Sequence, residues 1–410
     1  MHILLIKEAT LLKLLYFLNL YRTDTVFNSL KGLLLLKVYG NEELKNKDIG
    51  YVHHRQNKTI DLRKLMKKLL TTMLLIALCL PGSLLAADKK KSPLDAWQPN
   101  FDPKGAEYTY ILSNVSHPVI EGVAVGYAIR DKVWEKSGGR LYVDFRPLSQ
   151  MGGEKDVIAK LKLGAIQGMM SSSVAAANVS DRLGIVNLPY VVDTFDKLET
   201  FRNTPETWEP FANGAQKQGL LVADVTGYGP YGWATTTPVT TIADAKQTNF
   251  RIAQAPVNTD LYKAWKLKFT VMPWPDVPQA LQTGVITGLD HTAIVCNITK
   301  KFTIAKSFTE LNYAQGLFVH LINKRWFKKL PQDLQDILLS VISEESEKAR
   351  AATRIQHETQ VAKAKEAGVK FISLSDTDIA SLKKMAEPVL EKWSKKIGPE
   401  YLETVRKTLK

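Results

Sequence analysis

Arg251 is the residue of this sequence best suited to bind an anion. It lies in Asn249-Phe250-Arg251-Ile252, an apolar stretch typical of a buried strand. A buried arginine needs a partner, and its planar guanidinium matches a carboxylate in two-point contact. The segment therefore indicates a carboxylate site, with a structural salt bridge or a solvent-facing strand edge as the alternatives.

Two tryptophans and a run of serines are further candidates for the wall of a polar cavity. Trp274 stands between two prolines and Trp233 follows a glycine-rich segment, but either ring can equally belong to the core. Ser171-Ser172-Ser173 ends a predicted strand, where hydroxyls and backbone N–H groups can bind a polar ligand. A helix N-cap is the alternative role of these serines.

No pattern in the sequence indicates catalysis. Asp290 and His291 are neighbours, but adjacent residues of a strand point to opposite faces and make a poor chelate. The sequence lacks nucleophile-elbow, phosphate-loop and zinc-protease motifs. We therefore expect no enzymatic activity, no metal and no cofactor. The histidines beyond residue 87 are His117, His291, His320 and His357.

The glycine-rich segment 227–232, Gly-Tyr-Gly-Pro-Tyr-Gly, matches a dinucleotide-binding fingerprint only in its spacing. That motif needs a helix after the last glycine and an acidic residue about twenty positions later. Here a Thr-Thr-Thr-Pro run follows, and Arg251 stands near the acidic position. A pliable crossover strand, whose glycines allow close approach to another element or a ligand, is the better interpretation.

Strand-like and helix-like segments alternate beyond residue 105, which predicts an α/β fold with largely parallel sheets and helices on both faces. A helix over residues 331–367 would be about 55 Å long, enough to cross two domains or one large domain. The expected strands are residues 108–113, 141–145, 166–171, 220–226, 250–253, 268–272 and 285–289, and the expected shorter helices are 119–136 and 153–163.

Residues 66–87 have the composition of a secretory signal peptide. A basic start at Met66 is followed by the apolar run 69–80 and by a small-residue end at Ala86-Ala87, where we expect cleavage. The apolar run is too short to span a bilayer. We therefore expect export to the periplasm and interpret residues 1–65 as a spurious or disordered extension. A genuine cytoplasmic or membrane-associated extension is the alternative.

Half of the net charge of +14 belongs to residues 1–87, which carry 13 Lys/Arg and 6 Asp/Glu. The moderate excess that remains, without a Lys/Arg stripe interleaved with aromatic residues, does not predict nucleic-acid binding. Cys296 is the single cysteine beyond the expected cleavage site, so an intramolecular disulfide is not expected.

From about residue 105 onward, the chain resembles the periplasmic solute-binding proteins of TRAP transporters (tripartite ATP-independent periplasmic transporters). The resemblance rests on the order and spacing of Pro147-Leu-Ser-Gln-Met-Gly-Gly-Glu154 with Asp156-Val-Ile and Leu163-Gly164, Leu188-Pro189-Tyr190, Ile242-Ala-Asp244, Phe250-Arg251, Ala280-Leu-Gln-Thr-Gly284 and Leu330-Pro-Gln-Asp-Leu-Gln335. It implies a two-lobed α/β periplasmic binding protein fold (Venus-flytrap) with crossing strands and a long helix spanning both lobes. On this basis we assign residues 88–104 to a flexible mature N-terminus, 105–228 and about 316–350 to lobe I, and 229–315 and about 351–410 to lobe II.

The resemblance also implies roles for single residues. In this family the arginine that matches Arg251 typically binds the ligand carboxylate, and an aromatic residue at the position of Trp274 covers the ligand. His291 stands where the family commonly has an asparagine, and Tyr231 stands where some members have a second arginine. Together with Trp233, these departures favour a bulky or aromatic monocarboxylate over a compact dicarboxylate or sialic acid. The predicted ligand-binding set also includes Ser171, Ser172, His117, Gln150 and Tyr190.

The function implied is that of a non-enzymatic periplasmic protein. It would bind an organic acid between its lobes and deliver the acid to the membrane subunits of a TRAP permease. A periplasmic sensor subunit for a receptor kinase or chemoreceptor is the alternative, since both classes use lobe closure as the signal.

Overall fold

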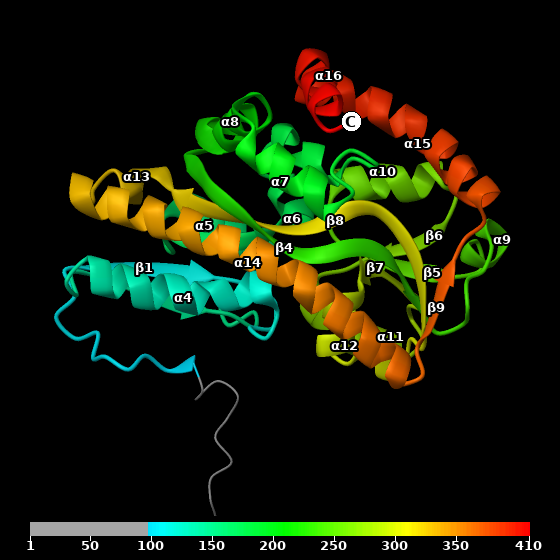
Figure 1. Cartoon of the computed structure of the whole chain (residues 1–410), viewed down its shortest axis with the longest axis horizontal. Helices are drawn as coiled ribbons and strands as arrows, with labels where there is room; N and C mark the ends of the chain where they lie inside the picture. The colour runs from blue at the N-terminus through cyan, green and yellow to red at the C-terminus, as the bar shows by residue number, and fades with distance from the viewer. Residues whose placement is uncertain (1–96) are drawn as a thin grey trace, which may run out of the picture. The chain divides into compact units, whose positions relative to one another are not determined.

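The computed structural model describes residues 97–410, which form a mixed α/β unit built around one sheet (Figure 1). The predicted signal peptide at 66–87, the extension before it and residues 88–96 lie outside the described residues. Among residues 97–410, no helix is both long and apolar enough to cross a membrane.

The described strands form a sheet in the order β2-β1-β3-β8-β4-β7-β5-β6, and β9 pairs with β8. Pairing is parallel within the β2-β1-β3 group and between β7, β5 and β6, but β4 and β8 are antiparallel to each other and to their outer neighbours β7 and β3. The expectation of largely parallel sheets was therefore wrong for the centre. The strands are β1 (Tyr108–Ser113), β2 (Leu141–Arg146), β3 (Gly168–Ser172), β4 (Leu220–Thr235), β5 (Asn249–Ile252), β6 (Lys268–Val271), β7 (Gly288–Thr292), β8 (Ser307–Asn323) and β9 (Lys370–Ser373).

The long strands β4 and β8 connect the two groups of parallel strands. The first half of β4 pairs with the last half of β8 beside β3, and the second half of β4 pairs with the first half of β8 beside β7 (Figure 1). The β4–β8 register shifts near Gly229 and again near Gly232. A Cβ at Gly232 would lie 2.5 Å from the backbone oxygen of Thr309, so only glycine fits there. The predicted glycine-rich crossover strand is confirmed.

Helices cover the sheet, and the longest of them, α14, contacts β4 and one helix from each group of strands. It lies against α4, which follows β1, and against α12, which follows β7 (Figure 1). It begins after Pro331 and ends before Ala367, as predicted. The α-helices are α4 (Glu121–Lys136), α5 (Glu154–Leu163), α6 (Ser173–Ala176), α7 (Phe195–Asn203), α8 (Pro205–Ala212), α9 (Ile242–Ala245), α10 (Pro256–Ala264), α11 (Val277–Gln282), α12 (Ala293–Ile298), α13 (Lys324–Phe327), α14 (Gln332–Glu366), α15 (Asp376–Ile397) and α16 (Pro399–Thr408).

The start of the described chain packs against α4 of the first group, whereas the C-terminal helices contact elements of both groups, α15 packing against α10 of the second. Trp97 stacks on Tyr127 of α4, with ring centroids 5.6 Å apart, and Phe101 stacks on Trp134 at 4.6 Å. At the other end, apolar residues of α15 and α16 belong to a core cluster that also contains residues of α5, α7 and α8. The exact lobe boundaries stay a prediction.

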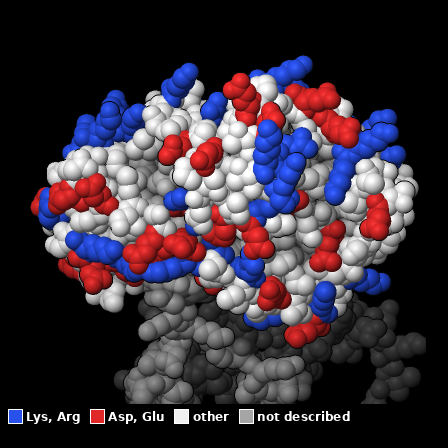
Figure 2. Space-filling view, turned by 45° about the horizontal axis from the view of Figure 1, so that its top comes forward, with Lys and Arg blue, Asp and Glu red and all other residues white. Residues whose placement is uncertain are grey.

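The charged surface is mixed in sign. Figure 2 shows Lys and Arg side chains interspersed with Asp and Glu across the visible face. Several of these charges pair with each other, such as Lys132 of α4 with Glu345 of α14 at 2.6 Å. The surface drawn in Figure 2 thus lacks the one-signed basic field that nucleic-acid binding requires.

Candidate ligand-binding site

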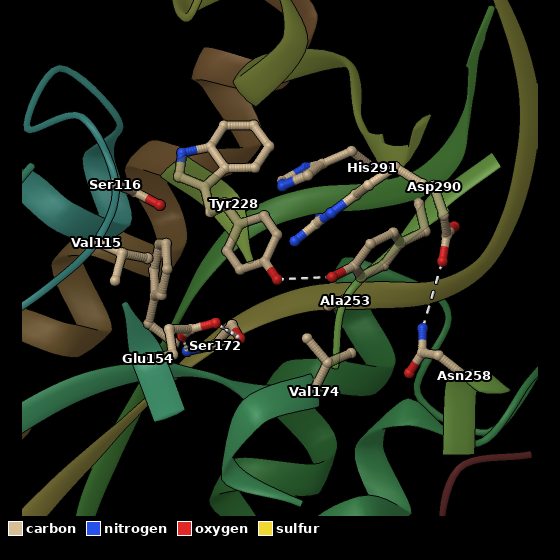
Figure 3. Close-up of a pocket in the computed structure, with 14 residues that line it drawn as sticks. Val115, Ser116, Glu154, Ser172, Val174, Tyr228, Ala253, Asn258, Asp290 and His291 are labelled. Carbon is tan, nitrogen blue, oxygen red and sulfur yellow. Dashed lines mark hydrogen bonds between the residues drawn. The ribbon is translucent and has the colours of Figure 1, made fainter. Parts of the chain in front are cut away.

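A small cavity, with a volume of about 30 Å³, lies where the two groups of strands meet (Figure 3). It has space for about one or two water molecules, so an organic ligand requires the walls to move apart. The first group of strands and its helices supply Val115, Ser116, Glu154, Ser172 and Val174, the second group supplies Arg251, Ala253, Asn258, Trp274, Asp290 and His291, and the long strands supply Tyr228, Tyr231 and Phe318.

Arg251 projects from β5 and is 5% exposed. Its Nε and Nη2 atoms donate to the backbone oxygen of Met272 at 3.1 and 2.9 Å, which fixes the plane of the guanidinium. Within residues 97–410 no carboxylate lies within 4.0 Å of it, and Nη1 makes no hydrogen bond. Burial lowers the pKa of this arginine, which nonetheless stays charged. The structure thus places a buried cation beside the cavity without a protein counterion in direct contact.

Trp274 covers this arginine. The Arg251 Cζ atom lies 5.6 Å from the centre of the indole ring, and the Nζ atom of Lys301 lies 5.0 Å from it. The His291 ring lies 4.8 Å from the same indole. Two cations therefore contact the ring through cation–π interactions, and the tryptophan forms a wall of the cavity.

His291, on β7, is neutral. Burial, together with the nearby charges of Arg251 and Lys301, lowers its pKa well below the usual value. Its Nδ1 atom accepts the backbone N–H of Thr292 at 2.9 Å. Because Nδ1 is the acceptor, the proton of the neutral ring lies on Nε2. His291 therefore supplies a neutral N–H donor, the same kind of group as the asparagine amide that the resemblance places there.

Two tyrosines of the glycine-rich crossover form the floor of the cavity. The hydroxyls of Tyr228 and Tyr231 are 2.7 Å apart and form a hydrogen bond, one of those marked by dashed lines in Figure 3. Gly229, with a φ of 96°, turns the backbone between them. The Tyr228 ring packs on Phe318 at 4.6 Å. Burial raises the pKa of both tyrosines, so both hydroxyls stay protonated and able to donate.

Two carboxylates also line the cavity. Glu154, the first residue of α5, accepts the backbone N–H of Ser172 at 2.6 Å and its hydroxyl at 2.8 Å. Asp290 of β7 accepts the Tyr313 hydroxyl at 2.8 Å and the Asn258 amide at 3.3 Å. Burial raises the pKa of Glu154, and it raises that of Asp290 to about 6. The sequence analysis singled out neither acid as a ligand contact.

The structure brings together half of the predicted set. Arg251, Trp274, His291, Tyr231 and Ser172 line the cavity. Ser172 also caps α6 by accepting the N–H of Ala175, so the alternative role expected for the serines is present as well. The predicted residues that do not line this cavity are Trp233, Ser171, His117, Gln150 and Tyr190.

Each of these five residues has another environment. Trp233 is fully buried and donates to the Tyr262 hydroxyl, so it belongs to the core. Ser171 donates to a neighbouring backbone oxygen. His117 accepts the N–H of Val119. Gln150 is exposed, and Tyr190 borders a separate depression beside α16.

Other lining residues had weak signals in the sequence. Tyr228 belongs to the same glycine-rich segment as Tyr231, and Asn258 lies in the helix that follows the arginine strand. Phe318 lies in β8, a strand that the sequence analysis did not identify. Residues 97–410 contain no cluster of three or more His, Cys, Asp or Glu residues suited to a metal ion.

The fold is that of a periplasmic solute-binding protein. Residues 116–396 match the model of the DctP family, described as bacterial extracellular solute-binding protein, family 7. The chain belongs to this family, and the suspected membership is confirmed. The family consists of solute-binding proteins, not enzymes, and the homologues are periplasmic binding proteins.

Individual relatives agree with this assignment. The C4-dicarboxylate-binding periplasmic protein DctP of Rhodobacter capsulatus is 25% identical over 68% of this chain and 85% of its own length. A TRAP periplasmic solute-binding protein from Shewanella oneidensis, solved with succinate, has a TM-score of 0.70 and 19% identity and covers 74% of this chain and 99% of its own. One from Desulfovibrio salexigens, solved with orotic acid, has a TM-score of 0.70 and 18% identity over 74% and 98%. These likenesses confirm the predicted fold class.

Proposed function

We propose that this protein captures an organic monocarboxylate between its two lobes and delivers it to a TRAP-type permease. The observation that carries the proposal is Arg251: a buried guanidinium, oriented by the Met272 carbonyl, lines a cavity and contacts no carboxylate of the described chain. A buried charge of this kind costs free energy unless a counterion pairs with it. The carboxylate of a ligand is that counterion.

The residues around Arg251 complete a carboxylate site. The Nε2–H of His291 is a second donor, and both Arg251 and His291 line the cavity. Charge-assisted hydrogen bonds of this kind are about twice as strong as neutral ones. Trp274 lies over the guanidinium and excludes water from the pair. One carboxylate thus receives an ionic contact from Arg251 and a hydrogen bond from the neutral His291 ring.

The lining favours one carboxylate on an apolar, bulky or aromatic body. Among residues 97–410, Arg251 is the one cation that lines the cavity, whereas Glu154 and Asp290 would repel a second carboxylate. The rings of Tyr228, Tyr231, Phe318 and Trp274 offer flat apolar surface instead. The names and bound acids of the relatives range from C4-dicarboxylates to orotic acid, so membership of the family does not choose among ligand bodies.

Binding and delivery follow from the placement of the lining residues in both groups of strands. A ligand that contacts Glu154 and Ser172 on one side and Arg251 on the other holds the predicted lobes together. The glycine-rich stretch of β4 and the paired stretch of β8 supply the flexible connection. The TRAP permease as the recipient is implied by the family.

The test is isothermal titration calorimetry of organic acids with wild type, Arg251→Ala and Arg251→Lys. Removing one partner of a buried ion pair costs about 3–5 kcal/mol, or about 150-fold to several thousand-fold in affinity. Lysine should also bind weakly, because an ammonium cannot reproduce the two-point contact. Arg146→Ala, an exposed arginine that pairs with Asp144 on the same strand, is the matched control. Wild-type affinity in both Arg251 variants would refute the proposed site.

A further inference from the structure

The buried charges in and behind the cavity balance without a ligand. Arg251 contributes one positive charge, and Glu154 and Asp290 contribute two negative charges. Lys301, behind Trp274 and 8% exposed, adds a second positive charge. Its Nζ atom donates to the Thr299 oxygen at 3.1 Å, and within the described part of the chain no carboxylate lies within 4.0 Å of it. A dianion would leave this site with two uncompensated negative charges, and a simple monoanion with one.

The opposite charges that face the cavity are separated. Glu154 begins α5 in the first group of elements, and Arg251 lies on β5 in the second. The two side chains form no ion pair within 4.0 Å, although both line the same cavity. A gap between an anion and a cation in a buried site fits a ligand that carries both charges in the reverse order.

Glu154 is better suited than Asp290 to receive the positive end of a ligand. Asp290 is held by Tyr313 and Asn258, and Figure 3 shows it turned toward Asn258. Each oxygen of Glu154 accepts one hydrogen bond, both from Ser172, and keeps further acceptor capacity. Ser172 also fixes the orientation of this carboxylate. Glu154 is therefore a positioned acceptor beside the cavity.

We infer that the ligand is a zwitterion, an amino acid or a related amine-bearing acid, whose carboxylate binds Arg251 and whose ammonium group binds Glu154. This inference rests on the proposed function and narrows its substrate class. A zwitterion leaves the net charge of the site at zero and pairs both separated charges. Each end contacts one of the two predicted lobes, so the molecule itself links them. Burial raises the pKa of Glu154, and an ammonium neighbour would lower it again.

The experiment compares acids that share one body and differ at the second carbon. The probes are 3-phenylpropanoate, phenyllactate and phenylalanine, then 4-methylpentanoate, 2-hydroxy-4-methylpentanoate and leucine, with succinate as the dianion. Calorimetry on the wild-type protein should show the amino acid of at least one series binding about tenfold or more tightly than its deaminated counterpart. In Glu154→Gln that preference should fall to about twofold or less. Asp156→Asn, an exposed carboxylate on the same helix, should leave it unchanged.

Several results would overturn the inference. If the deaminated or hydroxy acids bind as tightly as the amino acids, Glu154 accepts a neutral donor or none at all. If succinate binds more tightly than every amino acid, the site is a dianion site and carboxylate capture stands without the ammonium contact. An amino-acid preference that survives in Glu154→Gln assigns the ammonium to another group. No binding of any probe would count against the carboxylate site itself, and so against the proposed function.

Discussion

The Nδ1 atom of His291 accepts the backbone N–H of Thr292, and this contact makes Nε2 the donor of the ring. His291→Asn keeps a neutral N–H donor and should retain affinity within about threefold, whereas His291→Leu should lose about tenfold, the value of one hydrogen bond to a charged group. Calorimetry with the acid that binds most tightly measures the affinity of both variants.

Because the pKa of His291 is well below its usual value, this residue should not make the wild-type affinity change with pH between 6 and 8. A rise in affinity toward pH 6 that disappears in His291→Asn would show that the ring is protonated.

Trp274 should contribute to affinity both as a cover and as the aromatic partner of Arg251. We expect Trp274→Ala to weaken binding by about tenfold or more, and Trp274→Phe to weaken it less, because phenylalanine keeps an aromatic face. The control is Trp208→Ala, which removes an indole stacked on Arg202, 4.2 Å from its Cζ atom, outside the cavity. Equal losses in Trp274→Ala and Trp208→Ala would indicate a general loss of stability rather than a lost ligand contact.

Gly232 should be intolerant of any side chain. A Cβ there would lie 2.5 Å from the Thr309 oxygen and 2.6 Å from the Phe308 ring. Gly232→Ala is expected to lower the free energy of unfolding by about 1–3 kcal/mol, measured by denaturant titration. Gly227→Ala, in the same strand, places its Cβ at an ordinary 3.5 Å from Thr353 and should cost less. The reverse order of the two variants would contradict the observed β4–β8 packing.

The buried histidine His320 should make the free energy of unfolding depend on pH in the acidic range. Burial lowers its pKa to about 3, and its Nε2 lies 2.7 Å from the Tyr110 hydroxyl. The unfolded state takes up a proton near pH 6.5 and the folded state does not, so the free energy of unfolding should fall as the pH drops from 6.5 toward 3. His320→Gln should be less stable than wild type at pH 7, with the difference narrowing by more than 1 kcal/mol at pH 4. A difference that does not change with pH would mean that His320 is protonated in the folded state.

Local patterns in the sequence predicted much of the fold. Strand β1, helix α14 and the glycine crossover follow from short-range apolar spacing and from proline or glycine at element ends. Strand β8 was missed because it lacks apolar–polar alternation. Covered on both faces for most of its length, it buries polar residues such as Gln315 and His320 beside apolar ones. A strand of this kind has no clear period to detect.

The candidate site was only partly predictable, for a related reason. Arg251 could be identified as a candidate from the sequence because a charged side chain in an apolar, buried strand needs a partner. The approach of Glu154 and Asp290 to that arginine depends on the sheet order, in which β8 and β4 lie between β3 and β7. Trp233 carried the same aromatic signal as Trp274, but a bond to Tyr262 places it in the core. Residue type alone does not distinguish a cavity wall from an interior.

The pairing of β3 with β8 has a consequence for how the molecule is made. Residues 168–172 of β3 pair with residues 318–322 of β8. The β8 residues leave the ribosome much later than those of β3. Strand β3 pairs with β1 early but lacks its second neighbour, β8, until most of the chain has been synthesised, and contacts so distant in sequence form slowly. Late completion of the central sheet would suit the export that residues 66–87 predict, because a translocon threads an unfolded chain.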